Sequence, residues 1–548
     1  PLLLMAGLAH MGLGSNARAR EYLELYSKQA PDRAGAEAMA RLHLSERDTE
    51  KAIFTLESYL RGRTPDPQTL ALLSSARLAA GRPAQATQLM REALRGQDSP
   101  AFHALLGMSL QQQGQSAEAE AAFKRALQKA PNEPMALTAL AELYVGSGRA
   151  ALVPALLAPA MKANPGRDMA RYQVLLGRAR MALGELPAAR TAFEAALAQD
   201  GGLSSARLHL ARALALSGDG AGASRLLEAM VARDEQPVDA ALELADLALA
   251  AGKPEAVRQW LLKAVGKSVA PDSRAGVALV EFLVRQGDAA AAAEQAKRLL
   301  AQSPDDFALL IASARVALAQ RDGPGAVRPL VLAGRSARGD AGKLWLVARL
   351  QMNAGDLKGA AYTLEKALSE QDKLLPLNLL HVELALREGN GALAAQRLEP
   401  LLKRYPADPR VHSLAGQVAL SRQQPAQAVA AFRRAHELAP SSETVLRLHG
   451  AMLGQVGVNQ SLALLDQWLA KHPSDAVVRN ALAEAQVATG QLAAARANYE
   501  TLLTQTQSNA VRNNLASVLL RQKDPRALQV AEQALVLEPA RDAPLVLI

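Results

Sequence analysis

Several residue types that other folds and chemistries depend on are scarce in this sequence of 548 residues. It has no cysteine, which excludes disulfide frameworks, cysteine-ligated zinc and thiol nucleophiles. Its aromatic residues are 3 Trp, 8 Tyr and 7 Phe, fewer than a strand-rich sandwich or barrel usually carries. Hydrophobic residues still make up 49% of the chain, so it has enough apolar material to fold and is not of the disordered class.

The excess of positive over negative charge is also small, although the chain is basic overall. Lys and Arg number 62 against 53 Asp and Glu, a net charge of +9 that is spread along the chain. Proteins that bind nucleic acids concentrate basic charge on one face or stripe. The pI of about 9.7 therefore does not indicate a nucleic-acid partner.

Long apolar runs are missing as well. Nowhere do 18 apolar residues follow one another, so no transmembrane helix is expected. Residues 1–14 are apolar like the core of a signal peptide, but they lack a basic start, include His10 and show no cleavage signal. A chain that opens on Pro1 is expected to be a processed or trimmed piece, with any export signal upstream.

No catalytic constellation is visible. The nine histidines form no HExxH motif and no metal-ligand pair with a carboxylate, and no GxSxG sequence occurs. Gly266, Lys267 and Ser268 match the end of a phosphate-binding loop, but Leu261 stands where that loop needs glycine. We therefore expect no enzyme, no catalytic residue, no cofactor and no metal.

What the sequence does contain is a period. Glycine or a polar residue breaks an apolar helical pattern at regular steps of 33 to 36 residues: Gly14, Arg47-Asp48, Gly81, Gly114, Gly148, Gly184, Gly218, Gly252, Gly287, Asp322-Gly323, Gly355, Gly389, Gln423, Gly457, Gly490 and Lys523-Asp524. Prolines close the units with the same step: Pro31, Pro65, Pro131, Pro165, Pro237, Pro271, Pro304, Pro406, Pro440 and Pro473. About sixteen units of roughly 34 residues indicate an array of helix–turn–helix repeats.

Each unit carries the residues that such a turn needs. Glycine at the break permits the left-handed backbone that ends the first helix. A following aspartate, such as Asp288 or Asp356, can cap the second helix, and proline then stops it. Small residues recur where the two helices must approach: Gly107, Gly177, Gly416, Ala119, Ala126, Ala189, Ala196, Ala428 and Ala435.

This pattern resembles the tetratricopeptide (TPR) repeat. In the unit from Pro100 to Pro131, the matching positions are Leu106, Gly107, Leu110, Gly114, Ala119, Phe123, Ala126 and Pro131. The resemblance covers essentially the whole chain and implies an all-α superhelical TPR solenoid of about sixteen repeats. We expect one continuous solenoid with an N-terminal array at 1–304, an irregular unit at 305–339 and a C-terminal array at 340–548. Prolines predict kinks near Pro154, Pro159, Pro324 and Pro329.

In TPR proteins the first helices line the concave face, and their ninth position points toward the ligand. In this sequence that position is read as Glu142, Arg178, Arg212, Asp246, Glu281, Val316, Arg349, Glu383 and Gln417. One interpretation is a ladder of ion pairs between repeats, Glu142 with Arg178, Arg212 with Asp246 and Arg349 with Glu383. The other is a basic patch of Arg171, Arg178 and Arg212 for an acidic peptide or an anionic glycan, with Tyr172 as a stacking surface.

Trp345 is a second candidate. It occupies a ligand-facing position, and Arg349 follows one helical turn later. The indole could stack on a sugar ring or a partner's side chain, or it could pack against the adjacent repeat. Trp260 and Trp468 fall in second helices and are expected to belong to the core or its backing.

The C-terminal half suggests a narrower resemblance. Residues 511–539 read VRNNLASVLLRQKDPRALQVAEQALVLEP, and 465–503 and 279–304 carry related segments. These resemble the TPR-repeat lipoprotein family (PrsT) of the exosortase/PEP-CTERM system. That family has an N-terminal lipobox cysteine, which this sequence lacks, and continues beyond this C-terminus.

From both resemblances we predict a non-catalytic protein–protein interaction scaffold in bacterial exopolysaccharide biosynthesis or export. It would be periplasmic, anchored to the outer membrane by an upstream lipid, with proteins of that pathway and an anionic glycan as candidate partners. The alternatives are a TPR protein that binds polysaccharide or peptide directly, the regulatory part of a larger enzyme, and a cytoplasmic location.

Overall fold

The computed structural model describes residues 2–163, 166, 168–269, 272–455, 457–506 and 508–537. Within these ranges the regular structure consists of helices α1 to α32 and one 3₁₀ helix, η1, without a strand. The predicted all-α fold is therefore confirmed. Four prolines used in the repeat and motif analysis, Pro1, Pro165, Pro271 and Pro539, lie outside the described residues.

Contacts divide the chain into two compact units, unit 1 (Pro1–Ser268) and unit 2 (Val269–Ile548). The helices of unit 1 are α1 Leu2–Gly12, α2 Asn16–Gln29, α3 Arg33–Ser45, α4 Thr49–Leu60, α5 Pro67–Ala79, α6 Pro83–Gly96, α7 Pro100–Gln112, α8 Ser116–Lys129, α9 Pro134–Gly146, η1 Ala150–Leu152, α10 Val153–Ala163, α11 Met169–Ala182, α12 Leu186–Gln199, α13 Ser204–Leu216, α14 Gly220–Ala232, α15 Pro237–Ala250 and α16 Pro254–Lys267. The helices of unit 2 are α17 Arg274–Arg285, α18 Ala289–Gln302, α19 Phe307–Ala319, α20 Gly323–Ser336, α21 Ala341–Asn353, α22 Leu357–Glu370, α23 Leu375–Arg387, α24 Gly391–Arg404, α25 Pro409–Ser421, α26 Pro425–Leu438, α27 Ser442–Leu453, α28 Val458–Lys471, α29 Ala476–Ala488, α30 Leu492–Gln505, α31 Asn509–Arg521 and α32 Ala527–Leu537. The division at 304 and 339 stays a prediction.

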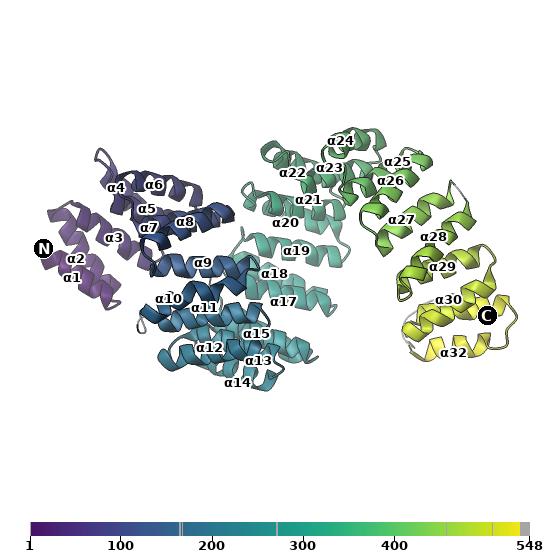
Figure 1. Cartoon of the computed structure of the whole chain (residues 1–548), viewed down its shortest axis with the longest axis horizontal. Coiled ribbons are helices and arrows are strands. Elements are labelled where there is room, and N and C mark those ends of the chain that lie inside the picture. The colour runs from purple at the N-terminus through teal and green to yellow at the C-terminus, as the bar shows by residue number, and fades with distance from the viewer. Residues whose placement is uncertain are drawn as a thin grey trace. The chain divides into compact units, whose positions relative to one another are not determined.

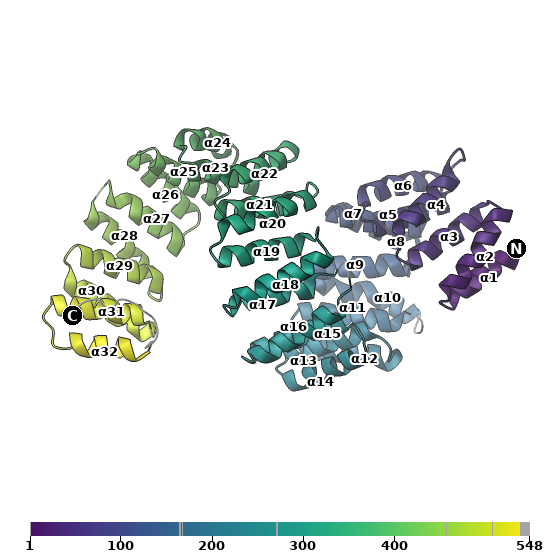
Figure 2. The ribbon, with the colours of Figure 1, turned by 180° about the vertical axis from the view of Figure 1, so that it is seen from behind.

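Each odd-numbered helix pairs with the even-numbered helix that follows it, and successive pairs stack side by side within a unit (Figures 1 and 2). The first helices of adjacent pairs also touch one another, as α9 does with α11 and α21 with α23. They therefore form a continuous face from α1 to α15 in unit 1 and from α17 to α25 in unit 2. Among the described residues, no helix has the length and apolar character that spanning a bilayer requires.

The predicted breaks coincide with the turns inside the helix pairs. Twelve of them are glycines with positive φ. The other four turns place a non-glycine residue in that left-handed region, at Arg47, Arg321, Gln423 and Lys523. The predicted break at Asp322 and Gly323 is thus one position late, because Gly323 already begins α20. The aspartate caps form as predicted, since Asp288 accepts from the Ala291 amide at 3.1 Å and Asp356 from the Gly359 amide at 2.9 Å.

The small residues lie where the two helices of a pair approach most closely. A Cβ atom on Gly107, Gly177 or Gly416 would stand 2.5 Å from the ring of a phenylalanine on the second helix. Those rings belong to Phe123, Phe193 and Phe432, and all three are buried. Glycine is therefore required at these positions by packing, because any side chain would collide with the ring.

Proline changes one pair visibly. The second helix α10 contains Pro159 and is preceded by the 3₁₀ turn η1. Proline cannot donate to the helical hydrogen-bond ladder, and the helix is shorter here than in most other pairs, at 11 residues. Pro329 lies inside α20, which runs from Gly323 to Ser336 without interruption.

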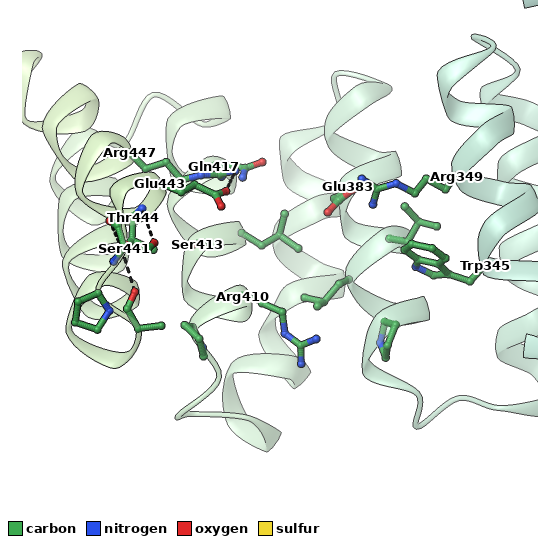
Figure 3. A pocket seen from close by; sticks show the side chains of 17 residues that line it. Trp345, Arg349, Glu383, Arg410, Ser413, Gln417, Ser441, Glu443, Thr444 and Arg447 are labelled. Atoms are coloured by element: carbon green, nitrogen blue, oxygen red, sulfur yellow. Dashed lines mark hydrogen bonds and ion pairs between the residues drawn. The ribbon is translucent and has the colours of Figure 1, made fainter. Parts of the chain in front are cut away.

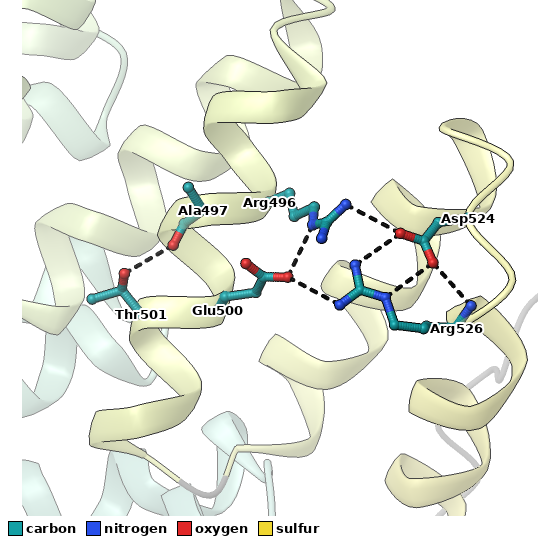
Figure 4. A network of polar contacts seen from close by, with 6 residues as sticks. All are labelled: Arg496, Ala497, Glu500, Thr501, Asp524 and Arg526. Carbon is teal, nitrogen blue, oxygen red and sulfur yellow. Dashed lines mark hydrogen bonds and ion pairs between the residues drawn. The ribbon is translucent and has the colours of Figure 1, made fainter.

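Polar networks tie neighbouring pairs together at their surfaces. In Figure 4, Arg496 of α30 contacts Glu500 at 2.9 Å and Asp524 at 3.1 Å. Asp524 lies in the turn before α32 and also accepts from Arg526 at 2.8 Å. These hydrogen bonds hold the pKa of Asp524 well below its usual range. The network links the pair α29–α30 to the pair α31–α32.

Candidate binding grooves

The first helices of unit 2 line a groove of about 470 Å³, within the size range of small-ligand sites. We call it the Trp345 groove. It is lined by Trp345, Arg349, Pro376, Leu379, Leu380, Glu383, Pro409, Arg410, Ser413, Leu414, Gln417, Ala439, Pro440, Ser441, Glu443, Thr444 and Arg447. These residues come from α21, α23, α25, α27 and the turn before α27, so four successive repeats build one site (Figure 3).

Trp345 and Arg349 lie on successive turns of α21 and contact each other in this groove. The indole is half-buried and packs against the core cluster that contains Leu344 and Leu380. The guanidinium carbon of Arg349 lies 5.3 Å from the centroid of the indole ring, a cation–π contact. Trp345 thus packs on the adjacent repeat and also lines the groove, so the two alternatives for it are not exclusive.

The predicted ion pair between Arg349 and Glu383 does not form among the described residues. Figure 3 shows the two side chains extending toward each other from α21 and α23. Arg349 stacks on Trp345 instead. Two other arginines of the groove are paired, Arg410 with Asp408 at 2.7 Å and Arg447 with Glu443 at 2.7 Å.

A smaller groove of about 440 Å³ lies on the first helices of unit 1. We call it the Arg178 groove. It is lined by Met108, Met135, Thr138, Ala139, Glu142, Arg171, Val174, Leu175, Arg178, Leu203, Ser205 and His209. Arg171 and Arg178 therefore line the same groove, whereas Arg212 and Tyr172 are not part of its lining. That these arginines bind a ligand stays a prediction.

Only one of the two ion pairs predicted for the arginines of unit 1 forms. Arg178 pairs with Glu142 at 3.1 Å, which confirms that rung. The predicted pair of Arg212 with Asp246 is wrong, because Arg212 binds Glu243 at 2.7 Å, one turn earlier in α15. Arg171 is exposed and no ion pair joins it to another residue that the structure describes.

Tyr172 cannot serve as the predicted stacking surface. Its side chain is only 2% exposed and belongs to the core cluster that also contains Leu137 and Leu140. Burial also raises the pKa of its hydroxyl. The residue lies next to Arg171 in the sequence, but successive positions of a helix point about 100° apart, so one faces the groove and the other the core.

His209 is a member of the Arg178 groove that the sequence analysis missed. Its imidazole stacks on the buried ring of Phe193, with centroids 5.7 Å apart. Burial, followed by the charges of Arg178 and Arg212, lowers the pKa of His209 to about 4. The histidine is therefore neutral at pH 7 and adds no charge to the groove.

The unit 2 residues that the sequence analysis overlooked follow the same repeat. Ser413 and Arg447 stand one and two repeats beyond Leu379, at the position that Trp345 occupies in α21. Val316, the residue predicted at the ninth position of α19, is only 2% exposed. Arg315 occupies that place and pairs with Glu281 at 2.6 Å. Steps of 34 residues from Trp345 along the sequence lead to Ser413 and Arg447.

Comparison with known proteins identifies the class. Two tetratricopeptide repeat family models match the chain, one at residues 71–134 and 379–443 and the other at 110–179 and 180–238. The chain therefore carries tetratricopeptide repeats, and its remaining described helices continue the same pairing.

One curated relative is the "Cellulose synthase operon protein C" of Xanthomonas axonopodis pv. citri, 31% identical over 280 residues. The match covers 48% of this chain and 18% of that protein, so the chain spans less than a fifth of the relative's length. A solved tetratricopeptide repeat protein from Parabacteroides merdae is 15% identical and covers 45% of this chain and 97% of its own, with a TM-score of 0.38. The Cut9–Hcn1 hetero-tetramer structure is 16% identical and covers 85% and 98%, with a TM-score of 0.29.

Proposed function

We propose that this chain is a non-catalytic scaffold that binds proteins of a bacterial exopolysaccharide synthesis or export pathway in the periplasm. The observation that carries the scaffold role is the tandem array of helix pairs whose first helices form open grooves. A repeat stack of this kind presents an extended surface for partners. The likeness to a cellulose synthase operon protein supports the pathway.

The periplasmic location and the upstream lipid anchor rest on a different observation. The NNLA segment and the repeats around it resemble the TPR-repeat lipoproteins of the exosortase/PEP-CTERM system. A lipoprotein of that kind would hold the scaffold at the outer membrane, where polysaccharide leaves the cell. Fractionation of the producing bacterium tests this, and recovery of the full-length protein from the cytoplasm would contradict it.

The Arg178 groove is the surface that best fits a protein partner. Its floor contains Met108, Met135, Val174 and Leu175, and flexible methionine side chains adapt to varied apolar surfaces. Arg171 stands exposed beside this floor. The groove therefore fits a protein segment that inserts apolar side chains and places an acidic residue on Arg171.

A photo-crosslinking residue at Ser205, inside the groove, tests this function in the producing bacterium. The same residue at Tyr362, which is 72% exposed on α22, serves as the control. We expect Ser205, and not Tyr362, to crosslink to a protein encoded with the polysaccharide genes, and Arg171→Glu to reduce that crosslink. Deletion of the gene should reduce secreted polysaccharide; normal secretion together with no site-specific crosslink would refute the proposal.

A further inference from the structure

The Trp345 groove carries a row of polar groups that repeats with the fold. Arg349, Glu383 and Gln417 stand 34 residues apart, at the same position of α21, α23 and α25. Adjacent first helices touch, so the three groups follow one another along the groove. A guanidinium only donates hydrogen bonds, a carboxylate only accepts them and an amide does both.

The charges of this groove balance. Arg410 and Arg447 are neutralised by Asp408 and Glu443 at 2.7 Å each. The lining groups left without an ion pair among the described residues are one cation, Arg349, and one anion, Glu383. A ligand that carries charge of one sign would gain from one of them and be repelled by the other. The groove thus favours a ligand without net charge.

Apolar groups line the groove beside this polar row. They are the indole of Trp345, which Arg349 contacts at 5.3 Å, together with Leu379, Leu414 and the prolines at 376, 409 and 440. A sugar ring has the matching division, with an apolar face of C–H groups and an edge of hydroxyls. Each hydroxyl both donates and accepts, so a row of hydroxyls can satisfy a guanidinium, a carboxylate and an amide in turn.

We infer that the Trp345 groove binds a strand of neutral polysaccharide. The hexose ring lies against the indole of Trp345, and its hydroxyls bond to Arg349, Glu383 and Gln417 along α21, α23 and α25. This inference goes beyond the proposed protein scaffold and rests on it only for the source of the glycan. Unit 2 would then hold the polymer while unit 1 holds a protein.

Isothermal titration of the whole chain with neutral hexasaccharides of glucan, mannan and galactan tests the inference, with an oligogalacturonate as the anionic comparison. At least one neutral oligosaccharide should bind, and more tightly than the uronate. Trp345→Ala should weaken that binding at least about tenfold, because it removes the aromatic contact area. Trp260→Ala, which removes a half-buried indole from unit 1, should leave it unchanged.

Two further variants keep the test independent of folding. Trp345→Phe retains an apolar ring in the core cluster and should weaken binding less than Trp345→Ala does. Glu383→Gln keeps the side-chain shape but leaves Arg349 as an unbalanced cation, so the oligogalacturonate should gain affinity about threefold or more relative to the neutral ligand.

Three results would overturn the inference. They are no binding of any neutral oligosaccharide at millimolar concentration, tighter binding of the uronate by the unaltered chain, and equal affinities for Trp345→Ala and Trp260→Ala. None of these bears on the crosslink at Ser205 or on secretion in the deletion strain. Failure of the glycan site and failure of the scaffold are therefore separate outcomes.

Discussion

The Arg178 groove and the Trp345 groove lie on the same face of the same repeated helix pair, yet their arginines have different partners. Four residues before Arg178 stands Val174, and one repeat earlier stands Glu142, with which Arg178 pairs. Four residues before Arg349 stands Trp345, and one repeat earlier stands Arg315, which Glu281 already occupies. Arg178 forms an ion pair that joins two repeats. Arg349 lines a groove without an ion pair among the described residues.

The comparison teaches that a repeat position does not have a single role. A TPR-like array supplies equivalent places for side chains, and the neighbours one turn and one repeat away decide what a charge there does. Where an opposite charge is within reach, the side chain ties two repeats together. Arg349 differs because an aromatic ring lies one turn away: it stacks on Trp345 although Glu383 extends toward it from the next repeat, and it forms no ion pair among the described residues.

The largest expected effect is a loss of stability when a charge is buried between the helices that carry one of the two grooves. Ala126 is 0% exposed and contacts Ala104 and Ala136, the latter on α9 of the Arg178 groove. Ala126→Asp buries an unpaired charge and should cost about 3–5 kcal/mol. Hydrogen exchange should show α8 and α9 losing protection while α23 and α25 keep theirs, because each repeat contacts only its neighbours.

Ala121→Asp is the matched control for this variant. Ala121 lies on the same helix and is exposed, so the same substitution should leave exchange nearly unchanged. If Ala126→Asp exchanged like the unaltered protein, the assignment of Ala126 to the contact between repeats would be wrong.

Replacing a packed glycine beneath each groove should have a smaller effect. Gly177 and Gly416 face Phe193 and Phe432 at 2.5 Å, so Gly177→Ala and Gly416→Ala should each cost about 1–3 kcal/mol by overpacking. Each loss should be confined to its own unit when followed by hydrogen exchange. Gly146→Ala, where the added methyl group meets nothing within 4 Å, should not destabilise α9.

Acid should act on the Arg178 groove through His209. Its pKa is about 4 in the folded chain, below the unfolded value of about 6.5. The unfolded chain therefore binds the proton more readily, and stability falls as the pH drops from about 6.5 toward 4, by up to about 2 kcal/mol at pH 5. His209→Gln should reduce the difference in α13 protection between pH 7.5 and pH 5. An equal loss of protection in both proteins would show that another group is responsible.

The smallest effect distinguishes the two arginines directly. A double-mutant cycle with Arg178→Ala and Glu142→Ala should give a coupling of up to about 1 kcal/mol, as expected for an exposed ion pair. The same cycle with Arg349→Ala and Glu383→Ala should give less, since no ion pair joins them. Equal coupling energies from the two cycles, measured by urea unfolding, would show that Arg178 and Arg349 do not differ in how they connect neighbouring repeats.

Much of the fold could be predicted from local signals, because those signals act within a few residues. Glycine at the turn, aspartate at the cap and proline after the helix each restrict their own stretch of backbone. The position of Gly107 opposite Phe123 follows from the period once the helices are known. The predicted break at Asp322 and Gly323 is one position late because Arg321 adopts positive φ without being glycine.

The candidate sites could be predicted only in part. Arg171, Arg178, Trp345 and Arg349 line grooves as the ligand-facing positions suggested. Tyr172 did not, because neighbouring positions of one helix face different directions. The sequence also could not show that Arg212 would choose Glu243 over Asp246, since both carboxylates are in reach of a long side chain and only their final distances decide.

The sequence by itself determined the helix pairs, their turns and the small residues between them, because periodic local preferences repeated along the chain leave one consistent arrangement. Only the tertiary structure decided which predicted arginine pairs formed, and that Arg171 and Arg349 line grooves without an ion pair among the described residues. The reason is that an ion pair between repeats joins side chains about 34 residues apart, whose separation is set by how the helices pack rather than by any preference of the residues alone.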